Sequence, residues 1–535
     1  MILSLAELYG QSRLFQDYIT NFEKLAPFFS GDYRDEKAYA GLAEQVLQVP
    51  RPHREQLAAI LTEQNTSYGC SAATLANIQK LAQKDCLAVV GGQQTGLFAG
   101  PLYTIYKALT TIKLARQLSE KLSVPVLPVF YLVSEDHDFA EVQWAGIVDS
   151  HNRFKRLVYE PDALPERTPV SEIVLDASIS SLLQLLEQEM AETEFKHDIL
   201  HALAACYRQG QSFVHAFACW LTKMLHEYGI VLLDASDARL KPMLKPVFEK
   251  ELKELVTVYA IRQTNKKLVA AGYHTQLAVQ PERPAVFILR NGRHSLQRQG
   301  DVYKEMNSGH PFTIDELLAN PHMLSPKAAL RPIAEDTLLP TIAYVGGPSE
   351  IAYWAQLRTV YQSFRLPMPI IVPRASFTLI EPKIRRHLQR FNLSPLSLLK
   401  NPQAVKREVL KGLIPEELRV KIVETRFNIY KEWRELSAQI SQFDPSLIRF
   451  IEKTENNLNK QIQALEQKLI RSVQEREKTV TEQMKAVMDN LLPQGQLQER
   501  SLNVVPFLIK YDWAFVQKLY HAVDPKVFHH QILEL

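Results

Sequence analysis

Three polar segments each follow a short apolar run and carry side chains that could do chemistry. The first is Gly91-Gly92-Gln93-Gln94-Thr95-Gly96, which follows the apolar run 87–90. Glycines let a backbone approach a ligand closely, and the N–H groups of such a loop, with a helix N-terminus behind it, suit an anion. Two glutamines and a threonine are costly to bury unbonded, so Gln93, Gln94 and Thr95 are candidate substrate ligands. A tight turn that needs glycine is the structural alternative.

The same segment resembles a phosphate-binding loop only in part. Gly91 and Gly96 have the outer spacing of GxxxxG, but Leu97-Phe98 follow where that motif carries Lys and Ser or Thr. The lysine that reaches phosphate and the hydroxyl that binds Mg²⁺ are therefore missing. A conventional P-loop is excluded.

The second segment is Ser134-Glu135-Asp136-His137-Asp138, directly after the apolar run 124–133. Carboxylates around one imidazole perturb each other's proton affinity and could hold an ammonium group, bind Mg²⁺ or act as a general base. We therefore take Asp136, His137 and Asp138 as candidate catalytic residues and Ser134 as a candidate substrate ligand. An acid-rich helix N-terminus would produce the same pattern without any site.

The third segment, Gly346-Gly347-Pro348-Ser349-Glu350, repeats the pattern of apolar run, glycine pair and proline. Tyr344 lies on the preceding run. Tyr344, Gly346, Gly347 and Glu350 are candidates for orienting a polar group of the substrate, although helix capping alone explains part of the pattern.

A fourth, weaker candidate lies near the C-terminus in the segment PQGQLQERSLN, residues 493–503. Gln498, Arg500 and Asn503 are candidate nucleotide ligands. Most loops of this composition are plain connectors, and that alternative stays open.

The elements that must position these segments alternate between strand and helix. Buried strands are predicted at 87–90, 124–133, 230–234, 341–345 and 369–372, and a helix follows Pro101, which suits its first position. This alternation predicts a doubly wound α/β core with insertions at about 151–225 and 270–340. Open α/β sheets bind ligands beyond the carboxyl ends of their strands, where the first three polar segments lie.

The character of the chain changes beyond about residue 400. Glycine is absent between Gly412 and Gly495, and apolar residues recur at coiled-coil spacing, with a predicted turn at Asp444-Pro445 and a break near Arg476. We predict a core domain over 1–400, a helical hairpin over 401–492 and a segment over 493–535 that returns to the core. The apolar stripe must pack on the core or on a second subunit, and a homodimer through the coiled coil is favoured.

Composition limits the class of protein. The net charge of +3 gives no reason to expect nucleic acid or an acidic membrane as partner. No stretch approaches the roughly 20 apolar residues of a membrane span, and the N-terminus does not have the pattern of a signal peptide. The four cysteines are scattered and form no CxxC pair. We therefore expect a cytoplasmic protein with reduced thiols.

The motifs GGQQTGLFAGPLYTIYKA, SEDHDFAEV, LRPIAEDTLLPTIAYVGGPSEIAYWAQL and PQGQLQERSLN closely resemble the BshC family of bacillithiol biosynthesis. The resemblance runs from about residue 85 to the C-terminus. It implies a Rossmann-type core with two connecting-peptide insertions, similar to class I aminoacyl-tRNA synthetases, and a coiled coil that dimerises. Where those synthetases carry an HxGH-like signature, this chain has GGQQTG without histidine. Lys327 stands where we expect asparagine in most of the family.

The resemblance also implies a reaction, the addition of cysteine to glucosaminyl-malate as the last step of bacillithiol synthesis. Joining a carboxylate to an amine requires activation, so ATP is the expected cofactor, with ADP or AMP as product; Mg²⁺ could assist, although no residue is assigned as a metal ligand. Two alternatives remain: a nucleotidyl-transferase acting on another small molecule, and a non-enzymatic coiled-coil protein that binds a nucleotide.

Overall fold

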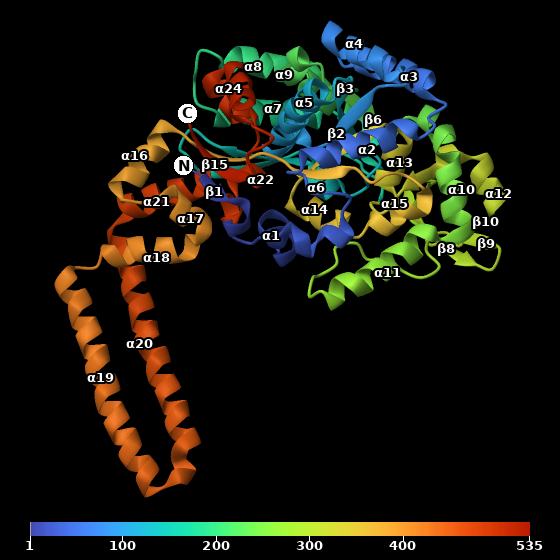
Figure 1. Ribbon diagram of the computed structural model, residues 1–535. Helices are drawn as coiled ribbons and strands as arrows, with labels where there is room; N and C mark the ends of the chain where they lie inside the picture. The colour runs from blue at the N-terminus through green and yellow to red at the C-terminus, as the bar shows by residue number, and fades with distance from the viewer. Residues whose placement is uncertain (1) are drawn as a thin grey trace. The chain divides into compact units, whose positions relative to one another are not determined.

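The computed structural model describes residues 2–535, shown in Figure 1. The chain forms two compact units. The first comprises residues 1–378 together with 496–533, and the second comprises residues 379–495 together with 534–535. The first unit therefore contains the core and the returning C-terminal segment, and the second contains the helical hairpin.

A five-stranded sheet in the order β13-β12-β2-β3-β6 forms the centre of the first unit, and neighbouring strands in it are parallel. Its strands are almost wholly buried, which fits their continuous apolar sequences. This confirms the predicted doubly wound core. The strands are β2 (Leu87–Gln94), β3 (Val126–Val133), β6 (Val231–Asp234), β12 (Thr341–Gly346) and β13 (Ile370–Pro373).

The sequence prediction ended the first strand too early. β2 continues through Gly91-Gly92-Gln93-Gln94, because β3 beside it extends to Val133 and pairs with every residue of β2. The glycines are needed for space: a Cβ on Gly91 would lie 2.5 Å from Thr111 Oγ1, and one on Gly92 would lie 3.1 Å from the Tyr131 carbonyl oxygen. The two glutamines are therefore held on a strand end and do not belong to a loop.

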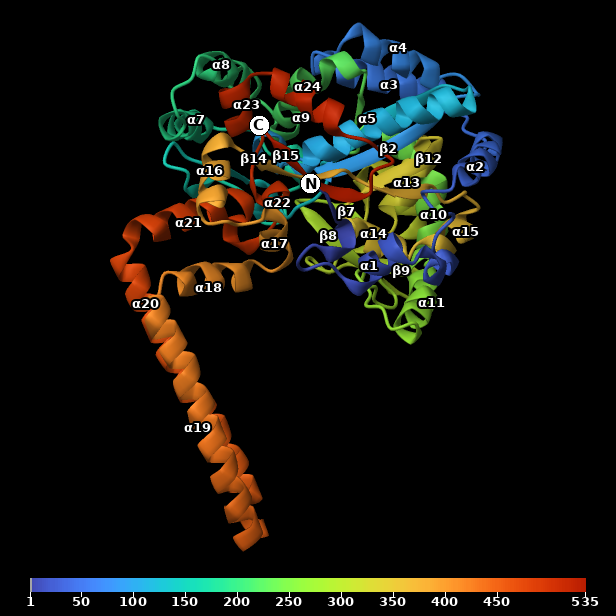
Figure 2. The same ribbon diagram turned by 60° about the vertical axis from the view of Figure 1, so that its left-hand side comes forward.

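Helices cover both faces of this sheet (Figure 2). Helix α5 (Tyr103–Leu122) packs on β2 and β3, and α14 (Pro348–Trp354) contacts β12 and β13. The N-terminal segment adds further cover, since α2 contacts β12 and both α3 and α4 contact β6. The remaining helices around this core are α1 (Arg13–Thr20), α2 (Glu36–Gln48), α3 (Arg54–Ser67), α4 (Ala72–Leu81), α13 (Arg331–Leu338) and α15 (Arg358–Phe364).

Two long insertions separate the core strands. The one between β3 and β6 holds a two-stranded antiparallel sheet and four helices: α6 (Phe139–Val142), β4 (Trp144–Val148), β5 (Phe154–Val158), α7 (Ser178–Glu189), α8 (Lys196–Cys206) and α9 (Phe213–Leu225). The one between β6 and β12 holds an antiparallel sheet in the order β10-β9-β8-β7-β11. Its elements are α10 (Lys245–Glu254), α11 (Val256–Ala270), β7 (Val286–Leu289), β8 (Arg293–Gln299), β9 (Val302–Glu305), β10 (Pro311–Thr313), α12 (Ile314–Ala319) and β11 (Leu324–Pro326).

The second unit is helical and centres on a long hairpin of α19 (Glu416–Phe443) and α20 (Ile448–Arg476). The turn between them lies at the predicted place, where the Asp444 side chain accepts a hydrogen bond from the Ser446 N–H. The predicted break falls between α20 and α21, at Glu477. Shorter helices complete the unit: α16 (Pro382–Arg390), α17 (Pro395–Lys400), α18 (Pro402–Gly412) and α21 (Lys478–Leu491).

The C-terminal segment returns to the first unit as α22 (Gln498–Ser501), α23 (Val505–Tyr511) and α24 (Ala514–Ala522). It ends in β15 (His529–Glu534), which lies between β1 (Ile2–Ser4) and β14 (Ser376–Ile380) in a three-stranded sheet. Across residues 2–535, the chain has no helix with the length and apolar character of a membrane span.

Candidate active site

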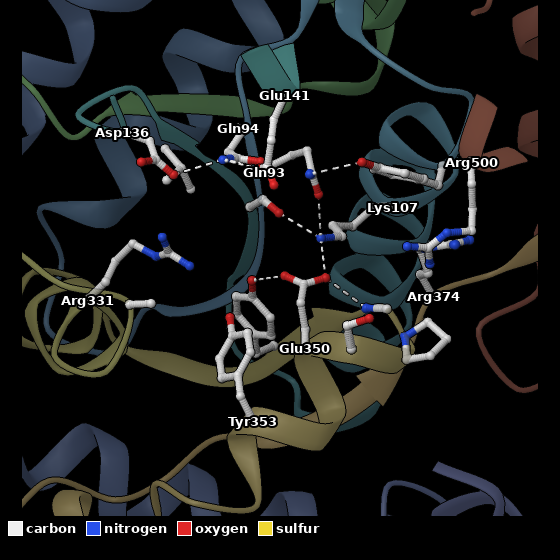
Figure 3. A pocket seen from close by; sticks show the side chains of 18 of the residues that line it. Gln93, Gln94, Lys107, Asp136, Glu141, Arg331, Glu350, Tyr353, Arg374 and Arg500 are labelled. Atoms are coloured by element: carbon white, nitrogen blue, oxygen red, sulfur yellow. Dashed lines mark hydrogen bonds and ion pairs between the residues drawn. The ribbon is translucent and has the colours of Figure 1, made fainter. Parts of the chain in front are cut away.

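A cavity of about 550 Å³ opens at the carboxyl ends of β2, β3 and β12, which is where an open α/β sheet places its ligands (Figure 3). Its size suits a small metabolite. All of its lining belongs to the first unit. The lining residues are Gly92, Gln93, Gln94, Tyr103, Lys107, Val133, Asp136, Glu141, Trp144, Ala328, Arg331, Tyr344, Gly347, Pro348, Ser349, Glu350, Tyr353, Arg374 and Arg500.

Gln94 joins the first two polar segments predicted from the sequence. Its Nε2 donates to Asp136 Oδ2 over 2.8 Å and to Glu141 Oε2 over 3.0 Å. One amide therefore holds two carboxylates at the same wall of the cavity, as the dashed lines of Figure 3 show. Two carboxylates so placed can accept hydrogen bonds from an ammonium group or from an amine that is losing its proton.

Asp136 is an ionised carboxylate. Burial pushes the pKa of Asp136 upward, but the guanidinium of Arg293, the Gln94 amide and the His137 N–H outweigh burial and hold the pKa below its ordinary value. Arg293 Nη1 lies 3.3 Å from Asp136 Oδ1, and Arg293 itself is fixed by Ser325 Oγ, which it reaches with Nε over 3.1 Å. The arrangement favours electrostatic binding of a cation over storage of a proton.

A buried ion pair joins the first and third segments. Lys107 on α5 is 1% exposed, and its Nζ donates to Glu350 Oε2 over 2.5 Å, to the Gly92 carbonyl over 2.7 Å and to Gln93 Oε1 over 3.0 Å. Glu350 also accepts from the Tyr344 hydroxyl over 2.7 Å and from the Gly347 N–H over 2.8 Å. Every donor of the ammonium group is used, which is the condition for burying a charge at tolerable cost.

The pKa directions fit this pair. Burial lowers the pKa of Lys107, and Glu350 opposes that change only in part. Burial raises the pKa of Glu350, but Lys107, Gly347 and Tyr344 outweigh it and hold the pKa below its ordinary value. Glu350 is therefore an anion fixed in place, and it orients the Tyr344 hydroxyl at the cavity wall.

Three arginines complete the lining. Arg374 is anchored, since its Nη2 lies 2.7 Å from the buried Glu499 Oε1. Arg331 and Arg500 extend toward the cavity from opposite sides in Figure 3, and within residues 2–535 neither has a carboxylate at ion-pair distance. A cavity with two guanidinium groups that no protein carboxylate neutralises is suited to anionic groups such as carboxylates or phosphates.

The structure brings seven of the candidate residues together at this cavity: Gln93, Gln94, Asp136, Tyr344, Gly347, Glu350 and Arg500. The other candidates do not line it. Thr95 and Ser134 are fully buried, and the Ser134 hydroxyl donates to Asp234. Asp138 is exposed. The Gly346 carbonyl accepts a hydrogen bond from the backbone N–H of Arg374 over 2.9 Å.

His137 also turns away from the cavity. Its ring packs edge-on against Phe287, with centroids 5.8 Å apart. Its Nδ1 lies 3.6 Å from Asp136 Oδ1, which is too long for a hydrogen bond, and has no hydrogen-bond partner among the described residues. Burial, Arg167 and Arg293 lower the pKa of His137, so the ring is neutral at physiological pH.

Asn503, a candidate nucleotide ligand, holds the backbone of a turn. Its Nδ2 donates to the carbonyls of Leu97, Phe98 and Gly100 over 2.7–3.3 Å. Phe98 and Ala99 in this turn have φ of 53° and 75°, a region costly for side chains other than glycine. The amide of Asn503 thus stabilises the turn that leads from β2 to α5. Gln498 is likewise buried.

Sequence reasoning missed Lys107, Tyr103, Trp144, Arg331, Tyr353 and Arg374 as lining residues. A signal for Lys107 existed: it is the one charged residue between Tyr103 and Ile112 of α5, a stretch that follows a buried strand, and a lone charge in such a stretch indicates a buried, partnered lysine. Arg374 could not be found this way, because its position depends on Glu499, 125 residues further along the chain.

No group of three or more His, Cys, Asp or Glu side chains within residues 2–535 is arranged to hold a metal ion. The carboxylates at the cavity are engaged by cations or amides, as described above for Asp136 and Glu350.

Comparison with known proteins covers almost the entire chain. Residues 1–375 match the family model of the N-terminal Rossmann-like domain of the bacillithiol biosynthesis protein BshC, and residues 377–535 match that of its C-terminal coiled-coil domain. The proteins named putative cysteine ligase BshC from Salinibacter ruber and Chlorobaculum tepidum are 31% and 32% identical over 97% and 95% of this chain. The aligned regions span 96% and 94% of those two proteins. The chain belongs to the BshC family of bacillithiol biosynthesis.

Proposed function

We propose that this protein is an ATP-dependent ligase that joins the carboxyl group of cysteine to the amine of glucosaminyl-malate, the last step of bacillithiol synthesis, in the cytoplasm. The names of the relatives support the cysteine ligase activity. The observation that carries the proposal is the convergence of polar side chains from β2, the segment after β3, α13 and α14 on one cavity. A protein that merely bound a nucleotide through a scaffold would not need such a density of carboxylates and guanidinium groups.

The lining of the cavity offers partners for both kinds of group that the reaction must bring together. Asp136 and Glu141, bridged by Gln94, suit the amine of glucosaminyl-malate, which carries a proton at neutral pH. Arg331 and Arg500 suit the carboxylates and phosphates. The Lys107–Glu350 pair fixes Tyr344 and the end of β2, so that these groups need not rearrange during the reaction.

The reaction needs an activated carboxyl group, since a free carboxylate is a poor electrophile. In one route the carboxylate attacks the γ-phosphorus of ATP and ADP leaves; in the other it attacks the α-phosphorus and pyrophosphate leaves. The amine then attacks the acyl carbon, phosphate or AMP departs, and one proton is released. In both routes Arg331 and Arg500 would balance the phosphate charge, and the ionised Asp136 would accept the hydrogen bond of the attacking amine. Mg²⁺ would arrive with ATP, because the described residues offer no cluster of free ligands for it.

The test is product formation by the purified full-length protein. Incubation with cysteine, glucosaminyl-malate, ATP and Mg²⁺ should yield bacillithiol by mass spectrometry, with one nucleotide consumed per amide formed. Analysis of ADP against AMP identifies the route. Release of pyrophosphate that does not depend on cysteine would instead favour a nucleotidyl-transferase acting on another molecule, and absence of any turnover would favour a non-enzymatic binding protein.

We also infer that the protein forms a homodimer through its hairpin. Large apolar side chains stay exposed along α19 and around its turn into α20, among them Phe427 at 68%, Phe443 at 89% and Phe450 at 66%. Patches of this kind mark interfaces. Sedimentation of the full-length protein should give twice the mass of 61.2 kDa, and Phe427→Glu should shift it toward the monomer. A monomeric full-length protein at micromolar concentration would contradict the inference.

A further inference from the structure

A second cavity opens at the same edge of the central sheet, beyond the carboxyl end of β6. Its volume is about 430 Å³, and its lining comes from the last turn of α3, the segment after β6 and the beginning of α9. All of these elements belong to the first unit. The two cavities share no lining residue. Because an open α/β sheet places its ligands at this edge, the second cavity is a candidate binding site.

Asp234, the last residue of β6, lines this cavity with a carboxylate that no cation balances. Its Oδ1 accepts hydrogen bonds from the Ser134 hydroxyl, from the Ser236 N–H over 3.0 Å and from the Ser236 hydroxyl over 2.8 Å. Within residues 2–535, its Oδ2 has no donor, and no lysine, arginine or histidine lies at ion-pair distance. Burial raises the pKa of Asp234, and these donors oppose that change only in part. A carboxylate in this state gains more from an added cation than one that is already paired.

The lining as a whole carries an excess of negative charge. Arg239 is the only lysine or arginine in the described lining, and it is already used: its Nη2 lies 2.8 Å from Asp237 Oδ2, and its Nη1 pairs with Glu63. Burial and Arg208 lower the pKa of His215, so this ring is neutral at physiological pH. Three lining carboxylates therefore face one guanidinium group. This balance disfavours phosphates and carboxylates as ligands and favours a cation.

Tyr68 supplies a hydroxyl group that has no partner. Tyr68 is 7% exposed, its hydroxyl bonds to no atom of residues 2–535, and that oxygen is not sealed from solvent. Burial raises the pKa of Tyr68, and Asp234 and Asp237 raise it further, so the hydroxyl stays protonated beside those carboxylates. The ring packs edge-on against His215, with centroids 5.3 Å apart, and the His215 ring nitrogens also have no hydrogen-bond partner in the described chain. A nearly buried hydroxyl without a partner costs free energy that a bound polar group recovers.

The cation that fits this cavity is organic and not a metal ion. Among residues 2–535, no three His, Cys, Asp or Glu side chains are arranged to hold a metal. An ammonium group needs less, because a single free carboxylate oxygen is enough to form an ion pair with it. A volume of about 430 Å³ also leaves room for a body of several carbon atoms behind the ammonium group.

We propose that the second cavity binds a small primary amine that carries hydroxyl groups. The ammonium group forms the ion pair that Asp234 Oδ2 lacks, and the hydroxyl groups bond to Tyr68 and His215. Ser134, which donates to Asp234, lies two residues before Asp136. The second cavity and the candidate active site are therefore joined by one short segment, but they bind through different side chains. The proposal concerns binding alone and does not depend on the proposed ligase activity.

A series of three probes that differ in one group tests the choice of ligand. D-glucamine is an ammonium ion at neutral pH, sorbitol has a hydroxyl group in place of its amine, and gluconate has a carboxylate at the same carbon. Calorimetric titration of the full-length protein should show D-glucamine binding at least about tenfold more tightly than sorbitol, within the range of a hydrogen bond to a charged group. Gluconate should bind most weakly. Equal affinity for D-glucamine and sorbitol, or a preference for gluconate, would overturn the proposal.

Single variants assign the binding to this cavity. Asp234→Asn should weaken binding of D-glucamine at least about tenfold, and Tyr68→Phe by about three- to tenfold. Tyr68→Phe removes only the hydroxyl and keeps the ring that packs on His215, so it remains informative if Asp234→Asn fails to fold. Tyr259→Phe makes the same change at a tyrosine that is 46% exposed outside both cavities and should leave the affinity unchanged. A loss of affinity in Asp136→Asn alone would place the amine in the candidate active site and overturn the proposal.

Hydrogen exchange locates the bound amine independently of affinity. Saturating D-glucamine should slow exchange at residues 63–68, 212–215 and 234–239, which surround the second cavity. The same concentration of sorbitol should have a smaller effect. Unchanged exchange in these segments at saturation would contradict the assigned site. A protein that shows this protection but no cysteine addition would refute only the proposed function.

Discussion

Replacing Glu350 by Gln preserves the size of the side chain but removes the charge that faces Lys107. The ammonium group then stays buried with two uncharged acceptors, the Gly92 carbonyl and Gln93 Oε1. Replacing Lys107 by Met instead leaves the Glu350 carboxylate without its cation. Glu350 is 22% exposed at the cavity and keeps the Tyr344 hydroxyl and the Gly347 N–H. The two single variants should therefore differ in stability.

The expected losses in the free energy of unfolding follow from the charge that each variant leaves unpaired. An uncompensated buried charge costs about 3–5 kcal/mol, which applies to Glu350→Gln because Lys107 is only 1% exposed. Lys107→Met should cost less, about 1–3 kcal/mol, since water and two donors still solvate the carboxylate. The double variant should cost less than the sum of the two single changes by about 1–3 kcal/mol, because the second change removes the stranded charge.

Thermal unfolding measures these differences. A unit of roughly 400 residues has an unfolding entropy near 0.8 kcal/mol/K, so each kcal/mol lowers Tm by about 1 °C. Glu350→Gln should then lower the Tm of the transition that belongs to the first unit by about 4–6 °C, and Lys107→Met by about 1–4 °C. Equal losses for both single variants, or strict additivity in the double variant, would refute the description of Lys107 as a charge that depends on Glu350.

Three further outcomes follow from other parts of the first unit. Burial lowers the pKa of His530 to about 4. Between pH 6.5 and 4 the unfolded chain therefore binds more protons than the folded one, so the protein loses up to roughly 3 kcal/mol of stability as the pH is lowered through this range. His530→Gln should flatten this dependence in unfolding measured at a series of pH values. Asn503→Asp keeps the acceptor for Val505 but removes the donor for three carbonyls, and should speed hydrogen exchange at residues 97–100 while Tm falls. Gly146→Ala would place a Cβ 1.9 Å from the Ser501 carbonyl oxygen and should lower Tm by several degrees, whereas Gly41→Ala in α2, with nothing within 4 Å, should raise stability by about 0.5–1 kcal/mol.

The fold could be predicted from the sequence because the apolar runs, the helix-capping residues and the order of strands and helices all indicated the same architecture. Continuous apolar runs such as 341–345 became buried parallel strands, and the turn at Asp444 fell where capping chemistry placed it. The predicted end of β2 at residue 90 was wrong, because the neighbouring strand determines whether a strand continues past a glycine pair. β3 extends to Val133 and supplies partners for Gln93 and Gln94, which no local pattern of β2 reveals.

The site could be predicted only in part, for a physical reason. Residues that lie directly at strand ends, such as Gln94 and Asp136, meet because parallel strands share one edge. Their neighbours in sequence point elsewhere: His137 packs on Phe287, and the Ser134 hydroxyl bonds to Asp234. Spacing along a segment does not determine which side chain faces a cavity. The cations that complete the site come from helices and distant strands and gain their positions from tertiary partners.

The most direct test of the proposed active site compares cysteine addition by the wild-type protein with that by Asp136→Asn. The wild-type protein should form bacillithiol and consume ATP in equal amount. Asp136→Asn should lose at least about 100-fold in kcat/KM, within the range of a group that acts on the attacking amine. Asp138→Asn makes the same change of charge at an exposed residue outside the cavity and should keep near-normal turnover. Full activity of Asp136→Asn would contradict the claim that the cavity at the ends of β2 and β3 is where the amide bond forms.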